Sequence, residues 1–175
     1  MEKGFDMKKV VFTGPECSGK STLSTAIANK FNLPLIKEYA REYINSLNRE
    51  YDYSDLVKIA EKQLIAENKY LNQKNTTDLI ICDTNLQVIK IWSQVKYGKC
   101  DSFILENQDQ NAYYILCYPD FEWEYDPLRE NKNNRMDLFK EYHQELIEQK
   151  QKFIISRGPY RERLSVISNE NIKMI

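Results

Sequence analysis

The chain has 175 residues, which is the size of one ordinary domain and too short for two large ones. Hydrophobic residues make up 42% of it and charged residues 29%, which excludes an intrinsically disordered chain. The 25 Lys and Arg residues are balanced by 26 Asp and Glu residues, whereas a dedicated nucleic-acid binder normally has a basic excess. The single histidine excludes a site built from several His ligands.

The cysteines and the hydropathy pattern indicate the cellular compartment of the protein. None of the four cysteines forms a C-x-x-C pair, so neither a zinc nor a redox site is expected, and a reducing compartment fits best. No stretch approaches the roughly 18 apolar residues of a membrane span. The polar segment 1–9 lacks the apolar core and cleavage site of a signal peptide. We therefore expect a cytoplasmic protein with no membrane or nucleic-acid partner.

Short apolar runs alternate with longer helical stretches, which is the pattern of a parallel sheet with crossover helices. In chain order we expect a strand at 10–12, a helix at 21–31, a strand at 33–37, a helix at 38–47, a helix at 54–71, a strand at 79–82, a helix at 86–97, a strand at 112–117, a helix from about 135 to 150, a strand at 153–155 and a helix from 161. Ser54 is the expected N-cap of the long third helix. The pattern predicts a single α/β domain over residues 1–175, with a five-stranded, doubly wound parallel sheet.

Residues 14–21 match the pattern G-x-x-x-x-G-K-[ST], between an expected strand and an expected helix. Two glycines let the backbone fold around an anion with its N–H groups pointing inward, and the helix N-terminus adds a positive partial charge. This context predicts a P-loop NTPase fold that binds ATP, rather than a glycine turn that binds nothing. Lys20 would reach the β- and γ-phosphates, Ser21 would bind Mg²⁺, and Thr22 would reach the α-phosphate. The candidate nucleotide-binding residues are Gly14, Pro15, Glu16, Cys17, Ser18, Gly19, Lys20, Ser21 and Thr22.

Two further sets of charged residues follow expected strands. Asp83 comes directly after the apolar run 79–82, where an acid beside the phosphate loop is placed to hold Mg²⁺, or simply to cap the next helix. Glu38 and Arg41 follow the second strand, and ligands of open α/β sheets bind at the carboxyl ends of strands. Glu38 is a candidate base for a substrate hydroxyl and Arg41 a candidate substrate or phosphate ligand. The alternative is a surface helix pair worth a few tenths of a kcal/mol.

The polar, irregular segment at about 121–135 carries Arg129 and Arg135 between the fourth strand and a helix. A mobile lid with an arginine can close on a moving phosphoryl group and exclude water. Arg129 is therefore a candidate catalytic residue, and the alternative is a solvated charged loop.

Aromatic side chains are candidate stacking surfaces for a substrate base, and we single out Tyr39, Trp92 and Trp123 as substrate-binding candidates. Each is also compatible with ordinary core packing. Tyr160 and Arg161, at the start of the last helix, lie where an adenine ring could rest, although helix-start chemistry explains them equally well.

Five segments together resemble the nicotinamide riboside kinase domain of NadR-type enzymes, in order and spacing, over about residues 8–172. They are Gly-Pro-Glu-Cys-Ser-Gly-Lys-Ser-Thr-Leu at 14–23, Glu-Tyr-Ala-Arg-Glu at 38–42, Cys-Asp-Thr-Asn at 82–85, Trp-Glu-Tyr-Asp-Pro-Leu-Arg at 123–129 and Tyr-Arg-Glu-Arg at 160–163. The resemblance implies a nucleoside-monophosphate-kinase-like fold and ATP-dependent phosphorylation of the 5′-hydroxyl of nicotinamide riboside, which gives nicotinamide mononucleotide.

By position, the resemblance assigns Lys20 and Ser21 to ATP and Mg²⁺, Asp83 to Mg²⁺ or the substrate hydroxyl, and Arg129 to the lid. One departure is Asn85, which stands where many members have a second acid. Two alternative functions stay open: a kinase of another nucleoside or nucleotide, and a nucleotide-binding regulatory protein. An N-K-x-D-type motif is missing after the fourth strand, which argues against GTP. The sequence leaves open the oligomeric state and whether Glu38 or Asp83 takes the proton.

Overall fold

The computed structural model describes residues 8–71 and 79–168, and in these ranges five strands form one parallel sheet. The strands are β1 (Lys8–Thr13), β2 (Leu35–Ile36), β3 (Leu79–Asp83), β4 (Tyr113–Cys117) and β5 (Lys152–Ser156). Their order across the sheet is β2-β3-β1-β4-β5, with every neighbouring pair parallel. The predicted five-stranded parallel sheet is confirmed, and its central strand β1 leads into the phosphate loop.

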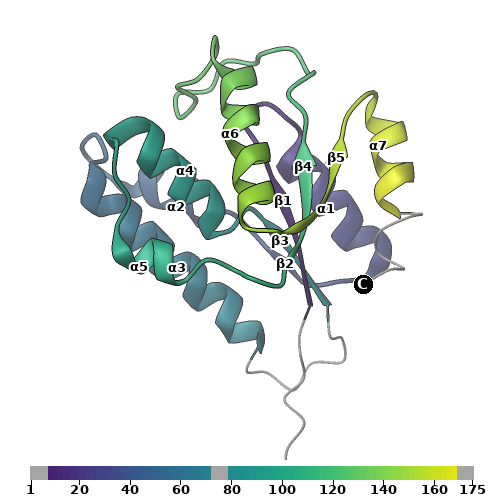
Figure 1. Ribbon diagram of the computed structural model, residues 1–175, viewed down its shortest axis with the longest axis horizontal. Coiled ribbons are helices and arrows are strands. Elements are labelled where there is room, and N and C mark those ends of the chain that lie inside the picture. The colour runs from purple at the N-terminus through teal and green to yellow at the C-terminus, as the bar shows by residue number, and fades with distance from the viewer. Residues whose placement is uncertain (1–7, 72–78, 169–175) are drawn as a thin grey trace, which may run out of the picture.

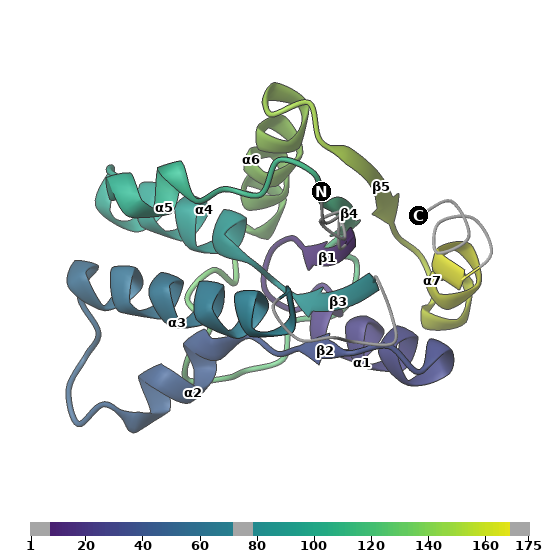
Figure 2. The same ribbon diagram turned by 90° about the horizontal axis from the view of Figure 1, so that it is seen from below.

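Helices cover both faces of the sheet, which makes it doubly wound (Figures 1 and 2). They are α1 (Lys20–Phe31), α2 (Tyr39–Ser46), α3 (Tyr53–Leu71), α4 (Leu86–Tyr97), α5 (Ser102–Glu106), α6 (Arg135–Glu148) and α7 (Tyr160–Val166). Because side chains alternate along a strand, Val10 and Phe12 of β1 pack toward α1, while Val11 packs toward α4 and α6. A third apolar cluster joins α2, α3, α4 and α5 beside the sheet.

Two local predictions need correction. Ser54 is not the N-cap of α3, because the helix begins at Tyr53 and the Asp52 carboxylate accepts a hydrogen bond from the Ser54 N–H at 2.8 Å. The short helix α5 was not expected, and it begins after Asp101, whose side chain caps it by accepting from the Phe103 N–H. Five residues are too few to show a helical stripe of apolar positions, which explains why the pattern missed it.

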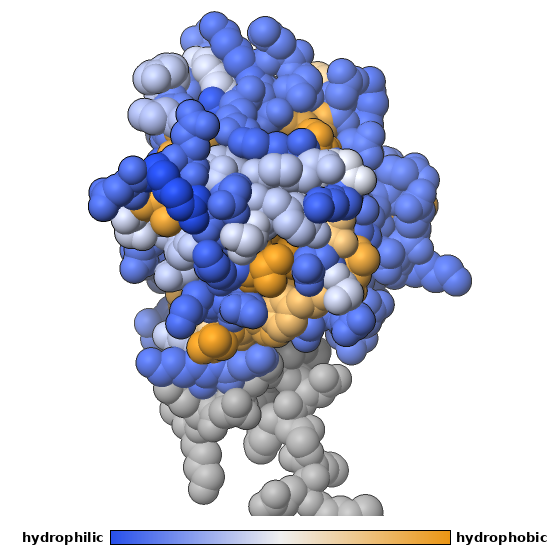
Figure 3. Space-filling model, turned by 90° about the vertical axis from the view of Figure 1, so that its left-hand side faces the viewer, coloured by the Kyte–Doolittle hydropathy of each residue, from blue (hydrophilic) through white to orange (hydrophobic). Residues whose placement is uncertain are grey.

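The helical flank formed by α2, α3, α4 and α5 is mostly hydrophilic, with apolar side chains gathered in a smaller area (Figure 3). Exposed apolar residues of these helices are Ile65 of α3, Val95 of α4 and Leu105 of α5. Within the described ranges, no helix is both long enough and apolar enough to cross a membrane.

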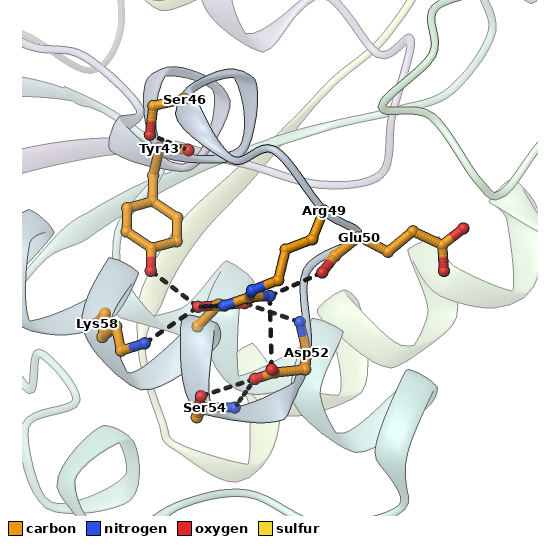
Figure 4. A network of polar contacts seen from close by, with 8 residues as sticks. Tyr43, Ser46, Arg49, Glu50, Asp52, Ser54 and Lys58 are labelled. Atoms are coloured by element: carbon orange, nitrogen blue, oxygen red, sulfur yellow. Dashed lines mark hydrogen bonds and ion pairs between the residues drawn. The ribbon is translucent and has the colours of Figure 1, made fainter.

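A buried carboxylate joins α2 to α3 (Figure 4). The Asp55 side chain is fully buried and accepts two hydrogen bonds from the Arg49 guanidinium, at 2.6 and 2.9 Å. It also accepts from the Tyr43 hydroxyl at 2.8 Å and from the Asp52 N–H at 2.9 Å. These contacts tie the end of α2 to the start of α3 and so fix the helix that begins directly after Glu38.

This cluster gives a pH-dependent stability prediction. Hydrogen bonding by Arg49 holds the pKa of Asp55 well below its usual range. The stabilisation is therefore present above the unfolded-state pKa of about 3.9 and is lost as the pH falls toward the folded-state value. We expect Asp55→Asn to lower the free energy of unfolding at pH 7 by about 1–3 kcal/mol, because buried donors lose their acceptor. We also expect the Tm of Asp55→Asn to decrease less than that of the wild type as the pH is lowered.

Chemical denaturation at pH 7 and thermal melting from pH 7 to 3 measure both effects. The matched control is Asp137→Asn, which removes an exposed carboxylate paired with the exposed Lys140. Equal losses of stability in the two variants would contradict the assigned role of Asp55.

Candidate active site

The loop between β1 and α1 is a tight turn that only glycine can make at two positions. Gly14 has φ 127° and Gly19 has φ 84°, both in the region that L side chains rarely adopt. A Cβ atom at Gly14 would lie 2.6 Å from the Cys117 carbonyl oxygen, and one at Gly19 would lie 2.7 Å from the Phe121 ring. The loop backbone is thus pressed against the end of β4 and the segment that follows it, with the N-terminus of α1 at its end.

Two side chains of the loop fold back on its own backbone. The Lys20 ammonium and the Ser18 hydroxyl each donate a hydrogen bond to the Pro15 carbonyl oxygen at 2.7 Å. Lys20 also lines the cavity described next, so its charge is held over the loop and not in bulk solvent. An anion seated in the loop would meet this ammonium together with the backbone N–H groups.

A cavity of about 470 Å³ extends from the phosphate loop toward α2, α4 and α6. The 121–135 segment and the start of α6 lie at the carboxyl end of the sheet, the upper end in Figure 1. The lining side chains outside the loop include an acid, cations, apolar groups and aromatic rings: Glu38, Arg41, Lys96, Arg129, Ile44, Val88, Ile91, Leu138, Tyr51, Trp92 and Tyr142. One end of the cavity can hold phosphates, and the other offers an apolar and aromatic chamber.

Two acids lie close to the phosphate loop. Asp83 ends β3, pairs in register with Phe12 of β1 and is 7% exposed. Burial raises the pKa of Asp83, while hydrogen bonding by Ser21 and the charge of Lys20 oppose the rise. Burial likewise raises the pKa of Glu38, and the charge of Lys20 again opposes the rise. The charge of Lys20 therefore acts on both carboxylates, and these three groups form one electrostatic unit.

The donor set around Asp83 fits a magnesium ion. Its Oδ1 atom is buried and has no hydrogen-bond partner among the described residues. Carboxylate and hydroxyl oxygens are the ligands that Mg²⁺ prefers, and Asp83 and Ser21 supply one of each. Within residues 8–71 and 79–168 no group of three or more His, Cys, Asp or Glu could hold a metal. A magnesium ion here would therefore complete its shell with phosphate oxygens and water, as is usual at nucleotide sites.

The arginine-bearing segment is packed against the phosphate loop. Arg129 lines the cavity, and its guanidinium donates to the Glu124 carbonyl oxygen at 2.7 Å. The Glu16 carboxylate accepts from the N–H groups of Glu130 and Asn131, at 3.1 and 3.0 Å. The segment thus lies against the phosphate loop.

The substrate-binding candidates separate into two groups. Arg41 and Trp92 line the cavity. Arg41 pairs with Asp126 of the lid at 2.8 Å, and the Trp92 indole donates to the Tyr51 hydroxyl at 3.1 Å. The Tyr51 and Trp92 rings meet edge to face, with centroids 5.0 Å apart.

The other candidates do not line the cavity. Tyr39 packs beside Tyr43, and the ring of Trp123 faces the Arg135 guanidinium at 5.6 Å. Tyr160 and Arg161 are exposed at the start of α7, where their predicted contact with adenine stays a prediction.

The sequence did not single out Arg163, although it belongs to the 160–163 segment. Its guanidinium is buried and donates to the carbonyl oxygens of Ser18, Tyr118 and Gly158, and it pairs with Asp120. It therefore ties the phosphate loop to the segments after β4 and β5. The sequence offers one clue: Arg163 is a second arginine two positions after Arg161, and no local motif accounts for it.

The sequence also predicted no role for Asn85 or for two residues at the far end of the cavity, Tyr51 and Lys96. Asn85 caps α4, because its side chain accepts from the Gln87 N–H and donates to the Tyr114 hydroxyl. Tyr51 and Lys96 line the cavity, and the Lys96 ammonium lies 3.9 Å from the centroid of the Tyr51 ring. No sequence motif marks either of them.

Comparison with known proteins agrees with this geometry. The family model described as AAA domain matches residues 9–163. A search of curated proteins found no match. Among solved structures, NadR protein in complex with NR has a TM-score of 0.72 at 19% identity, covering 93% of this chain and 51% of that one. A NadR structure in complex with NAD and AMP-PNP has a TM-score of 0.71, also at 19% identity, and this chain spans about half the length of both NadR chains.

Two matches span nearly the whole of both chains. Deoxyadenosine kinase from M. mycoides, with products dCMP and dCDP bound, has a TM-score of 0.63 at 19% identity, covering 95% of this chain and 100% of that one. Shikimate kinase from Bacteroides thetaiotaomicron has a TM-score of 0.53 at 13% identity, covering 95% and 97%. The fold is that of P-loop kinases, and these structural neighbours are nucleoside and small-molecule kinases.

Proposed function

The chain belongs to the AAA domain family, and from that premise we propose that it is an ATP-dependent kinase of a small molecule, with nicotinamide riboside as the first candidate substrate. The observation that carries the proposal is that Lys20 and Glu38 both line a cavity that extends beyond the phosphate loop, with Asp83 within range of the Lys20 charge. A protein that only bound ATP would need the loop but not a second chamber with the Glu38 carboxylate among its lining groups. We take residues 1–175 as one cytoplasmic kinase domain, with its lid at about 121–135.

The proposed reaction follows from the placement of these groups. The loop N–H groups and Lys20 would bind the β- and γ-phosphates. Ser21 and Asp83 would hold Mg²⁺, which would neutralise phosphate charge. The substrate hydroxyl oxygen attacks the γ-phosphorus, the bond to the bridging oxygen of ADP breaks, and the hydroxyl proton passes to Glu38. A raised pKa suits Glu38 to this task because proton acceptance is best near the working pH. Arg129 would stabilise charge on the moving phosphoryl group.

The chamber opposite the loop supports a nucleoside as the phosphate acceptor. Trp92 and Tyr51 offer aromatic faces there, and an aromatic face attracts a cationic ring such as that of nicotinamide. Arg41 also lines the cavity, and we assign it to a ribose or phosphate oxygen. The NR complex of NadR protein supports the choice of nicotinamide riboside as the first substrate to test.

A second candidate is a deoxynucleoside kinase. It is favoured by the match to deoxyadenosine kinase, which extends over the whole of that chain, whereas the NadR match covers about half. A Glu at the carboxyl end of the second strand suits either activity. The remaining alternative is a regulatory protein that binds ATP and phosphorylates no metabolite.

A coupled assay of ADP release separates these functions. Purified protein is tested with ATP and Mg²⁺ against nicotinamide riboside, deoxyadenosine, deoxycytidine, nucleoside monophosphates and shikimate. Turnover with nicotinamide riboside at least about tenfold above every other acceptor supports the first proposal, and a preference for a deoxynucleoside supports the second. Tight ATP binding with no acceptor-dependent ADP release would refute both and favour the regulatory protein.

Asp83→Asn tests the magnesium site. We expect the variant to need about tenfold or more Mg²⁺ for half-maximal turnover, because it loses one anionic oxygen ligand. The measurement is a titration of Mg²⁺ at fixed, saturating ATP. Asp101→Asn, which alters the cap of α5, is the control and should leave the titration unchanged. An unchanged titration in Asp83→Asn would remove this carboxylate from the metal site.

A further inference from the structure

Glu16 occupies a variable position of the phosphate loop, where the backbone binds phosphate and the side chain is not needed. Its carboxylate nevertheless makes three hydrogen bonds to the lid. Oε1 accepts from the Glu130 N–H at 3.1 Å and from the Asn131 side-chain amide at 3.2 Å, and Oε2 accepts from the Asn131 N–H at 3.0 Å. Hydrogen bonds to an ionised acceptor are about twice as strong as neutral ones, so these three bonds make a substantial polar contact between loop and lid.

The contact lies next to Arg129 in the chain. The Arg129 N–H donates to the Asp126 carbonyl oxygen at 3.0 Å, and its guanidinium lines the cavity. On the other side, the Glu130 carboxylate pairs with Lys96 of α4 at 2.8 Å. The lid backbone directly after Arg129 is therefore held to the phosphate loop by Glu16 and to α4 by Lys96.

We propose that Glu16 is a positioning residue that sets the lid on the phosphate loop so that Arg129 faces the phosphoryl group to be transferred. The proposal rests on the kinase function proposed above, because it gives Arg129 a phosphate to act on. A carboxylate suits the task because both its oxygens accept hydrogen bonds, and all three lid groups are donors. Glutamine at this position would turn its NH₂ group toward a donor of the lid, so the three hydrogen bonds could not all form.

The first test needs no activity. Hydrogen exchange at the Glu130 and Asn131 amides is measured on the free protein, in wild type and in Glu16→Gln. We expect exchange at least about tenfold faster in the variant, because one amide then faces an NH₂ group and the other keeps only a neutral acceptor. The matched control is Glu122→Gln, which neutralises an exposed carboxylate of the lid and should leave exchange unchanged. Equal exchange in wild type and Glu16→Gln overturns the proposal, whether or not the protein is a kinase.

The second test asks whether Glu16 acts through Arg129. We expect Glu16→Gln to lower kcat about 10- to 100-fold, the scale of a misplaced catalytic group, with KM for ATP changed by less than about threefold. In an Arg129→Ala background the same substitution should cost about twofold or less, since the group that Glu16 positions is gone. Asn131→Ala, which removes one of the three hydrogen bonds, should give a smaller loss and serves if Glu16→Gln folds poorly.

The outcomes separate the two proposals. A loss from Glu16→Gln that is equally large with and without Arg129 overturns the positioning role, because Glu16 would then act independently. A larger effect on KM for ATP than on kcat also overturns it, since the residue would then serve nucleotide binding. Absence of wild-type turnover refutes the kinase function and with it the role of Arg129, and the exchange measurement still decides whether Glu16 holds the lid.

Discussion

Lys20→Ala is expected to lower kcat/KM at least about 100-fold, the scale of losing one preorganised charge partner in a transition state. The ammonium lies over the phosphate loop, bonded to the Pro15 carbonyl oxygen, and its charge acts on both Glu38 and Asp83. Removing it takes away the cation that would meet the β- and γ-phosphates. Steady-state kinetics with ATP and the best acceptor measure the loss, and Lys30→Ala at the far end of α1 is the control.

Lys20→Ala should also change the pH–rate profile, which is measured independently of the loss in kcat/KM. Burial raises the pKa of Glu38 and of Asp83, and Lys20 opposes both shifts. Without Lys20 both pKa values should rise further, so the acid limb of the pH–rate profile should move to higher pH. An effect on kcat/KM of roughly tenfold or less, with an unmoved acid limb, would contradict the placement of phosphate in this loop.

The features predicted from sequence are those encoded locally. The phosphate loop has fixed spacing between Gly14, Gly19 and Lys20, and the buried strands are uninterrupted apolar runs, so both can be recognised within a few residues. Topology then brings Glu38 and Asp83 toward the loop, because the carboxyl ends of parallel strands meet at one edge of the sheet. The structure therefore confirms the predicted sheet, and it places Glu38, Arg41, Trp92 and Arg129 around one cavity, while their roles stay predictions.

The contacts that were missed join residues far apart in the chain. Glu16 contacts residues 114 and 115 positions later, and Arg163 reaches back 145 positions to Ser18. The sequence singled out Glu16 only as a position of the phosphate loop and did not single out Arg163, because only the folded chain supplies the groups that their side chains contact. The start of α3 was misplaced for a different reason, since Asp52 and Ser54 are both good capping residues and only the backbone geometry selects Asp52.

Glu38→Gln is expected to lower kcat about 100- to 10,000-fold, the contribution typical of a positioned general base. It should also raise the Tm of the ligand-free protein at neutral pH. Burial raises the pKa of Glu38 in the folded state above its unfolded value, so its stabilising contribution is present below the unfolded pKa and is lost as the pH rises through the folded pKa. At neutral pH the folded protein therefore carries the cost of a partly desolvated charge, which a neutral glutamine removes.

Comparison with a second carboxylate decides which group takes the proton. Asp83→Asn should share the rise in Tm, because burial raises the pKa of Asp83 too, but its turnover should recover in part at high Mg²⁺. Glu38→Gln should stay inactive at any Mg²⁺ concentration and should lose the acid limb of the pH–rate profile, since no group remains to be deprotonated for catalysis. Glu42→Gln, an exposed change in the first turn of α2, controls for the loss of charge near the start of that helix. If Glu38→Gln keeps both its turnover and the acid limb of its pH–rate profile, the base is Asp83. A stability gain in that variant would then leave Glu38 with a role in substrate binding alone.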